Sequence, residues 1–231
     1  MKIIFFNINQ FNNDPKGLEK FFTDHKKTVD IFCIQEIPET PINSLNDILY
    51  DYYKFHFSKI LPDYNCRADL STFVKKTSFD QIEQKAINVG HSDVTPAILT
   101  SFEYTNKTYN LINYHGIALP GHKNDTKSRI KASRLIIKCL NSLDGHKIIG
   151  GDFNLNPESK SIRMFEQAGY LNLIKEYNIK TTRNNNAWKL YPDGKQYYAD
   201  YTLVDSDLKI NSFDVINTQI SDHLPMVLDI A

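Results

Sequence analysis

The sequence predicts an α/β fold, in which strands and helices interleave within one compact domain spanning residues 1–231. The chain has 231 residues, which is enough to bury a sizeable core. Short apolar runs of strand length recur along it, and segments of helical periodicity lie between them. Apolar strands of this kind indicate sheets covered by helices, although their periodicity leaves the number of sheets open.

Each predicted strand is an apolar run, rich in Ile, Val, Phe or Tyr, that ends in polar residues. A final strand is predicted in the apolar run after Pro225. The other runs, with the residues that follow them, are "KIIFF" (2–6) before "NIN", "VDIFCI" (29–34) before "QE", "YNLINY" (109–114) before "HG", "HKIIG" (146–150) before "GDFN", and "YADYTLV" (198–204) before "DSD".

Three segments between these runs are predicted helices. Residues 14–27 gather apolar side chains on one face, with Asp14 as the cap. Residues 126–143 repeat apolar side chains near a period of 3.6. Residues 157–170 begin with a proline and end at Gly169, which is the usual asymmetry of helix termini.

The composition indicates a soluble protein without a membrane span or an obligate protein partner. The apolar start is too brief for a signal peptide, because Asn7 and Asn9 interrupt it. Cys33, Cys66 and Cys139 are sparse and widely spaced, which predicts reduced thiols and a cytoplasmic location. Lys plus Arg equals Asp plus Glu at 27 each, and this balance weakens the case for a long, sequence-independent grip on duplex nucleic acid.

Polar side chains recur where the apolar strands stop, and loops at strand ends are where sites are usually built. Asn7 and Asn9 would point the same way on an extended backbone. Glu36 offers a hard oxygen ligand of the type that Mg²⁺ prefers. His115 follows the next strand. Each has an ordinary interpretation as well: turn formers for the two asparagines, a solvated carboxylate for Glu36 and a half-buried histidine for His115.

The segment "IIGGDFNLNP" is a sharper signal. Its two glycines are predicted to let the backbone turn tightly. Asp152 and Asn154 would then share one face while Phe153 points into the core, which places a base or metal ligand beside a neutral donor. The alternative is an Asx-turn ahead of the helix that follows.

Asp200 lies inside an aromatic and apolar strand, where a carboxylate needs a partner. His223 is the predicted partner, because a buried Asp fixes the tautomer of an imidazole and favours its charged form. Asp222 and His223 stand side by side in "TQISDHLPMVLDI" (218–230). They can share a site only if the backbone leaves regular strand geometry before Pro225; otherwise they form a polar turn.

Taken together, these motifs resemble those of the endonuclease/exonuclease/phosphatase superfamily, the DNase I-like enzymes. The segments "FNIN", "CIQE", "NYHG", "GGDFN", "DYTLV" and "SDHLP" occur in the order found there, and the match spans residues 1–230. The resemblance implies a four-layer α/β sandwich, with two facing mixed β-sheets covered by helices. It also implies hydrolysis of phosphoesters with Mg²⁺, for which Mn²⁺ can substitute.

The resemblance further implies a metal site and a site for the attacking water. Glu36 would ligate the metal, assisted by Asn7 and Asp222. Asp152 would orient or deprotonate the water. Asn154 would hold that water or the phosphoryl oxygens.

Two imidazoles complete the implied site. His223, oriented by Asp200, would contact the phosphate and stabilise its developing charge. His115 would lie near the phosphate or the leaving oxygen. Bacterial abasic-site exonucleases tend to carry Tyr near this position, whereas DNase I-like nucleases and many phosphodiesterases or phosphatases carry His, as this chain does.

Two stretches bear on the choice of substrate. The run at 115–134 is either an anion-binding surface, with Arg129 or Lys123 near a phosphate, or a solvated helix face. The aromatic side chains around a Pro-Asp-Gly turn would either stack on a base or pack across a hairpin. These aromatic residues are Trp188, Tyr191, Tyr197 and Tyr198.

The predicted function is that of a Mg²⁺-dependent phosphodiesterase acting on nucleic acid. The alternative is a phosphatase or phosphodiesterase acting on a small phosphoester, such as a nucleotide, sugar phosphate or lipid headgroup. Neutral charge and a compact chain favour the alternative, whereas the frequent nuclease role of the superfamily favours the first. A non-catalytic binding module would lack a motif residue, yet every position is filled. A zinc hydrolase is not supported, since no H-E-x-x-H or paired-Cys spacing occurs.

Overall fold

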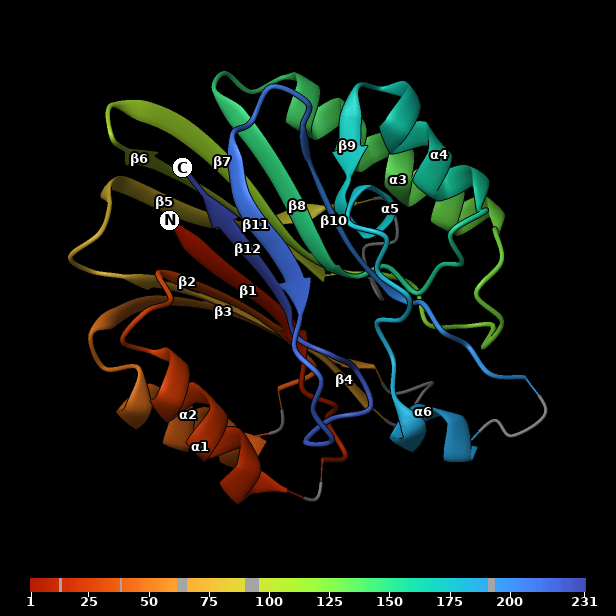
Figure 1. The fold of residues 1–231 in the computed structure, drawn as a ribbon, viewed down its shortest axis with the longest axis horizontal. Helices are drawn as coiled ribbons and strands as arrows, with labels where there is room; N and C mark the ends of the chain where they lie inside the picture. The colour runs from red at the N-terminus through yellow and green to blue at the C-terminus, as the bar shows by residue number, and fades with distance from the viewer. Residues whose placement is uncertain (13, 38, 62–65, 90–95, 191–193) are drawn as a thin grey trace.

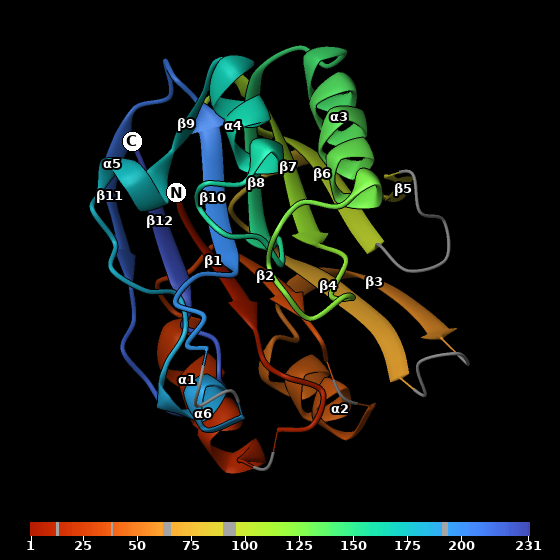
Figure 2. The ribbon, with the colours of Figure 1, turned by 90° about the vertical axis from the view of Figure 1, so that its right-hand side faces the viewer.

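The computed structural model describes residues 1–12, 14–37, 39–61, 66–89, 96–190 and 194–231. Two six-stranded sheets lie face to face, and helices cover their outer sides (Figures 1 and 2). The predicted α/β sandwich with two facing mixed sheets is therefore confirmed. Among the helices of the described ranges, none is long and apolar enough to cross a membrane.

The first sheet is mixed, because β1 pairs parallel with β2 and antiparallel with β12. It contains the predicted strands at 2–6 and 29–34 and the one after Pro225. In spatial order its strands are β11 (Ile210–Val215), β12 (Met226–Ile230), β1 (Lys2–Asn7), β2 (Ile31–Gln35), β4 (Cys66–Lys75) and β3 (Tyr52–Leu61).

The second sheet is also mixed, because β7 pairs parallel with β8 while the other neighbours are antiparallel. It contains the predicted strands at 109–114, 146–150 and 198–204. In spatial order its strands are β5 (Asp80–Asn88), β6 (Pro96–Tyr104), β7 (Lys107–His115), β8 (His146–Asp152), β10 (Asp200–Asp205) and β9 (Tyr170–Asn172).

The helices cover the two sheets separately. The pair α1 (Pro15–His25) and α2 (Glu39–Ile48) lies on the first sheet, whereas α3 (Lys127–Asn141), α4 (Lys160–Gln167) and α5 (Leu173–Glu176) lie on the second (Figure 2). The short helix α6 (Asn185–Leu190) lies at the same end of the molecule as α1 (Figure 2).

All three predicted helices are present. Asp14 caps α1, since its side chain accepts from the backbone N–H of Gly17. Thr126 caps α3 in the same way. The third helix starts later than predicted, because Ser159 is its cap and accepts from the N–H of Ile162.

The glycine pair of "IIGGDFN" corrects one prediction. Both glycines lie inside strand β8 and not in a turn. A Cβ on Gly150 would lie 2.6 Å from the ring of Phe5 in the opposite sheet. Gly151 has φ +130°, and a Cβ there would lie 2.1 Å from the carbonyl oxygen of Tyr114. These glycines therefore let β8 pass close to its neighbours directly before Asp152.

A buried polar bridge joins the two sheets near the ends of β2 and β7. Nε2 of Gln35, the last residue of β2, donates to Oδ1 of Asn113 in β7 at 2.7 Å. Nδ2 of Asn113 donates back to the first sheet, to the carbonyl of Ser71 at 2.9 Å. Because every one of these residues is buried, the bridge fixes one sheet relative to the other.

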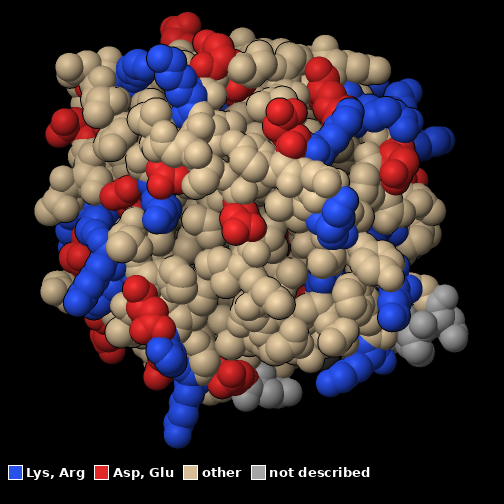
Figure 3. All heavy atoms as spheres, viewed as in Figure 1, with Lys and Arg blue, Asp and Glu red and all other residues tan. Residues whose placement is uncertain are grey.

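Two thiols can be described, and neither forms a disulfide: Cys33 is buried and Cys139 is half-buried, while the side chain of Cys66 lies outside the described residues. The surface carries both signs of charge. On the face seen in Figure 3, Lys and Arg are interspersed with Asp and Glu, as the zero formal charge suggests.

Candidate active site

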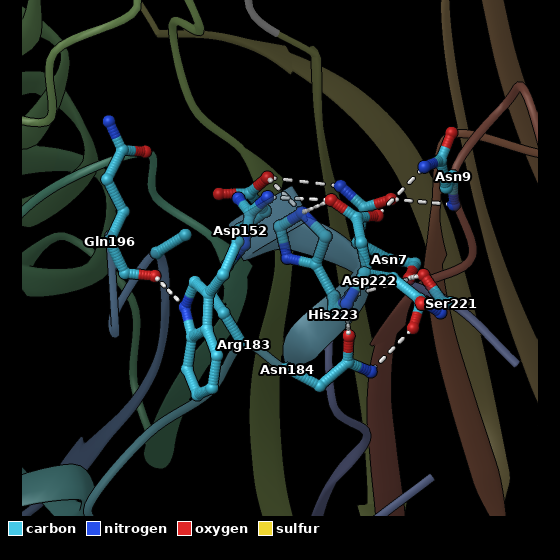
Figure 4. Close-up of polar contacts among 12 residues, drawn as sticks. Asn7, Asn9, Asp152, Arg183, Asn184, Gln196, Ser221, Asp222 and His223 are labelled. Carbon is cyan, nitrogen blue, oxygen red and sulfur yellow. Dashed lines mark hydrogen bonds and ion pairs between the residues drawn. The ribbon is translucent and has the colours of Figure 1, made fainter. Parts of the chain in front are cut away.

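The candidate site lies where strands of both sheets end together. Asn7 and Gln35 are register partners at the ends of β1 and β2. His115 and Asp152 are register partners at the ends of β7 and β8, and Asp200 opens the antiparallel strand β10 opposite Asp152. Since the sheets face each other, these ends bring side chains from distant parts of the chain to one place. Figure 4 shows Asn7, Asp152 and His223 pointing toward one another.

Asn7 links one carboxylate from each sheet. Its Nδ2 donates to Oε1 of Glu36 at 3.1 Å and to Oδ2 of Asp152 at 3.0 Å. Glu36 has φ +54°, so the backbone leaves strand geometry immediately after β2. The backbone N–H of Gln10 donates to the other oxygen of Glu36 at 3.3 Å. Glu36 is therefore held in the site, and not solvated on a loop.

His115 lies against these carboxylates. Its Nε2 is 3.3 Å from Oε1 of Glu36 and 3.9 Å from Oδ2 of Asp152, and neither buried ring nitrogen forms a well-aligned hydrogen bond with a residue that the structure describes. Burial alone would lower the pKa of His115, but Glu36 and then Asp152 outweigh it and raise this pKa. Burial would likewise raise the pKa of Glu36, but His115, His223 and Asn7 hold it well below its usual range.

Asp152 and Asn154 form a turn and belong to the site as well. The backbone N–H of Asn154 donates to Oδ1 of Asp152 at 2.8 Å, and Asn154 has φ +55°. Phe153 between them is buried, as predicted. Burial would raise the pKa of Asp152, but His223, Lys123 and His115 lower it overall. The Asx-turn and the functional interpretation are thus compatible.

The predicted pairing of Asp200 with His223 is present. Nδ1 of His223 lies 2.9 Å from both carboxylate oxygens of Asp200, and Nε2 lies 3.7 Å from Oδ2 of Asp152. Burial alone would lower the pKa of His223, but the carboxylates of Asp200, Asp222 and Asp152 raise it to about 9. The Asp200 contact leaves Nε2 directed at the site.

Asp222 also lies in the site, but its contacts differ from those of Glu36. Its Oδ2 lies 2.6 Å from a guanidinium nitrogen of Arg183, and its Oδ1 accepts from Nδ2 of Asn9 at 2.8 Å (Figure 4). Its backbone lies in a bend, and β12 begins only at Met226, so Asp222 and His223 can both face inward, as predicted. Its role as a metal ligand stays a prediction.

Asn9 departs from the expected extended geometry. It has φ +61°, and its backbone N–H donates to Oδ1 of Asn7 at 2.9 Å. Asn7 and Asn9 therefore form a turn, and they reach different carboxylates, Asp152 and Asp222.

The residues present fit a divalent cation. Ligand atoms of Glu36, His115 and Asp152 lie within 4.8 Å of one another. Two carboxylates suit a hard cation such as Mg²⁺ or Mn²⁺, and the imidazole of His115 has no other hydrogen-bond partner that would compete. Asp152, Asp200 and His223 form a second such group, but there Asp200 and His223 already satisfy each other.

Two basic side chains reach the site that were not among the predicted site residues. Lys123 donates to Oδ1 of Asn154, and Arg183 pairs with Asp222. Lys123 was one of five Lys and Arg side chains in the run at 115–134, but no sequence pattern marked Arg183. Arg129, the other basic residue considered for phosphate binding, is buried and donates instead to the backbone carbonyls of Ile117, Ala118, Pro120, His122 and Asn124.

The aromatic hairpin prediction is wrong for Trp188, which lies in helix α6. The helix forms because the side chain of Asn184 accepts from the N–H of Asn186 and caps its start. Trp188 still contacts Tyr197, with ring centroids 5.1 Å apart. Tyr198 donates to the carbonyl of Ile179, and Tyr191 lies outside the described residues.

Comparisons with known proteins bear on the family and the fold of the chain. The model of the Endonuclease/Exonuclease/phosphatase family matches residues 4–223. A search of curated proteins found no significant match.

Similar solved structures share the fold at low identity. An endonuclease/exonuclease/phosphatase from Bacteroides vulgatus has a TM-score of 0.79 at 16% identity, covering 100% of this chain and 98% of that one. TDP2 from D. rerio, complexed with single-strand DNA product, has a TM-score of 0.76 at 15% identity, covering 99% and 97%. A mannosyl-6-phosphatase from Bacteroides thetaiotaomicron has a TM-score of 0.76 at 15% identity, covering 100% and 99%.

Proposed function

The chain belongs to the endonuclease/exonuclease/phosphatase family, and from this membership we propose that it hydrolyses phosphoesters with a bound divalent cation, Mg²⁺ or Mn²⁺. One observation carries the proposal. Asn7 and Glu36 from the first sheet meet His115 and Asp152 from the second, beside the Asp200–His223 pair. A chance cluster of buried carboxylates would be costly, because each charge must be compensated.

The proposed cation site consists of Glu36 with Asn7, and the cation would neutralise phosphoryl charge and help to activate water. Asp222 is proposed as a further oxygen ligand, although Asn9 and Arg183 now engage its oxygens. His115 is proposed to lie near the phosphate or the leaving oxygen. This proposal is supported by its position beside Glu36, a proposed ligand of the cation, since Nε2 of His115 lies 3.3 Å from Oε1 of Glu36.

Asp152 is proposed to orient or deprotonate the attacking water. Its Oδ1 is held by the N–H of Asn154, and its lowered pKa keeps it ionised, so that it can accept a hydrogen bond from that water. Asn154 would hold that water or a phosphoryl oxygen. His223, charged and oriented by Asp200, would stabilise the negative charge that develops on the phosphate.

For the substrate, we propose a phosphodiester of nucleic acid, in keeping with the structural similarity to TDP2 in complex with a single-strand DNA product. A small phosphoester is the second candidate. The zero formal charge and the mixed surface in Figure 3 favour it, and a similar structure is that of a mannosyl-6-phosphatase. We propose a cytoplasmic location on the basis of the sparse, widely spaced cysteines.

The test is Asp152→Asn measured with and without a chelator. Fluorescent single- and double-stranded DNA and RNA oligonucleotides and a panel of small phosphoesters are incubated with Mg²⁺ or Mn²⁺. The substitution is expected to lower kcat by about 10²- to 10⁴-fold, the range for loss of a general base. Asp207→Asn, at an exposed carboxylate outside the site, is the control.

Chelation is expected to abolish turnover of wild type. Turnover that survives both chelation and Asp152→Asn would show that the reaction does not use this site. Cleavage of small phosphoesters without cleavage of any oligonucleotide would establish the second substrate class.

A further inference from the structure

Lys123 is a buried cation at the site that the proposed mechanism does not use. Only 7% of this residue is exposed, although it lies in the connection between β7 and α3. Its Nζ donates to Oδ1 of Asn154, and its backbone carbonyl accepts from the N–H of Asn156 at 2.7 Å. The segment that carries Lys123 is therefore fastened to the segment that carries Asp152 and Asn154.

The ammonium group of Lys123 lacks a full counter-charge. Within the described part of the chain it forms no ion pair shorter than 4.0 Å, and the hydrogen-bond acceptor it contacts is a neutral amide. Burying an ammonium without an adjacent carboxylate costs free energy. Burial accordingly lowers the pKa of Lys123, and Asp152 offsets this only in part. A bound anion would supply the counter-charge that this buried ammonium lacks, so the arrangement favours an anion-binding site.

Arg183 adds a second cation close enough to act on the first. Its guanidinium lowers the pKa of Lys123 by repulsion, and one of its nitrogens pairs with Asp222. Its Nε is buried and has no hydrogen-bond partner. Two buried cations therefore approach the site from different segments, and an anionic oxygen would relieve both the repulsion and the missing contacts.

We propose that Lys123 is a phosphoryl-binding residue, whose Nζ donates to a non-bridging oxygen of the substrate phosphate beside Asn154. This inference rests on the proposed function, since it assigns Lys123 to the same reacting group. It goes beyond the motif residues, because Lys123 contributes charge from outside them. Its role contrasts with that of Arg129 in the same basic run, whose donors are used by backbone carbonyls.

The test combines thermal unfolding in inorganic phosphate with steady-state kinetics. Lys123→Met keeps the length of the side chain and removes its charge, whereas Lys123→Arg keeps the charge. Lys131→Met is the matched control, because Lys131 is an exposed lysine of the neighbouring helix α3. Each variant is unfolded with and without phosphate, and kcat and KM are measured on the best substrate of the panel described above.

Without phosphate, Lys123→Met is expected to unfold at the same temperature as wild type or higher, since a buried charge is removed. Phosphate is expected to raise the unfolding temperature of wild type and Lys131→Met but not of Lys123→Met. The value of kcat/KM should fall about 10- to 100-fold in Lys123→Met, the loss of one charge-assisted hydrogen bond. Lys123→Arg should recover part of it.

Two results would overturn the inference. The first is that phosphate does not raise the unfolding temperature of wild type. The second is that Lys123→Met unfolds at a lower temperature than wild type and is still stabilised by phosphate, which would indicate a structural role for Lys123. Phosphate stabilisation that needs Lys123 in a protein without phosphoesterase activity would retain the anion site and reject the proposed function. Activity that needs Asp152 but is unchanged in Lys123→Met would support the proposed function and reject the role of Lys123.

Discussion

Asp200 is the neighbour that most favours the charged form of His223. Its pKa is raised to about 9 from the ordinary 6.5, and among the neighbours that raise it Asp200 contributes most against the opposing effect of burial. Because the folded-state pKa exceeds the unfolded value, the stabilisation by charged His223 is complete below about pH 6.5 and is lost as pH rises through about 9. Charged His223 is also the form proposed to stabilise the phosphate.

Asp200→Asn is therefore expected to lower the pKa of His223. The free energy of unfolding of the variant should fall below that of wild type at pH 6, and the gap should shrink by pH 10. Urea unfolding across this range measures the gap, and an NMR titration of the His223 ring measures the pKa. Parallel curves for the two proteins would mean that Asp200 does not set the charge of His223. Asp207→Asn serves as the control, because its exposed carboxylate lies outside the site.

Residue types at strand ends and the buried Asp200–His223 pair were predictable, whereas the burial of Lys123 and Arg183 was not. Asn7, Glu36 and His115 each follow an apolar run, so their order along the chain was visible in the sequence. Lys123 and Arg183 are buried only because segments far apart in sequence close around them. Nothing local distinguishes a lysine that reaches inward from a solvated one.

Among the structural elements, the connection between β7 and α3 receives many of its hydrogen bonds from one side chain. The guanidinium of Arg129, on the buried face of α3, donates to five backbone carbonyls between Ile117 and Asn124. An arginine can do this because its five N–H donors form a planar fork. The arrangement holds the segment that presents Lys123 to the site.

Arg129→Lys is expected to lower the free energy of unfolding by about 2–4 kcal/mol, because an ammonium leaves unpaired several carbonyls that are buried or partly buried. The segment at 117–124 should also become more sensitive to limited proteolysis. Arg134→Lys is the matched control, since Arg134 is exposed on the same helix. Chemical denaturation and mass spectrometry of the fragments check both effects. Equal stability of the two variants would show that the carbonyl contacts contribute little.

Whole elements were predictable where their pattern is simple. Buried strands such as β1 and β2 read as continuous apolar runs, and α1 shows both its cap and its apolar face. The edge strand β5 escaped prediction because most of its side chains are exposed and polar. Helix α6 was not predicted, because Trp188 suggested a strand whereas the cap formed by Asn184 favours a helix.

Across the whole molecule, the distance between the sheets sets how well the two halves of the site meet. Gly150 is the point of close approach, where a Cβ would lie 2.6 Å from the ring of Phe5. Gly150→Ala is expected to lower the free energy of unfolding by about 1–3 kcal/mol through overpacking, and to lower kcat by displacing Asp152 from Asn7. Gly121→Ala is the control, because a Cβ added there would meet no atom of the described residues within 4 Å beyond its chain neighbours. A stable variant with unchanged kcat would contradict this link.

The charge of the whole molecule decides between the two substrate classes in a measurable way. Its formal charge is zero, and acidic and basic side chains alternate on the face in Figure 3, so few surface contacts to nucleic-acid phosphates are expected. Each phosphate contact with a single strand adds about −0.7 to the slope of log affinity against log salt.

With one or two such contacts, the affinity for a single-stranded oligonucleotide should fall less than about tenfold between 50 and 200 mM salt. Fluorescence anisotropy with the Asp152→Asn variant measures this without cleavage of the probe. A fall of about 10³-fold would instead require about seven or more contacts. That outcome would identify an extended nucleic-acid track on the surface and exclude a small phosphoester as the sole substrate, because charge near the reacting phosphate alone cannot produce so steep a dependence.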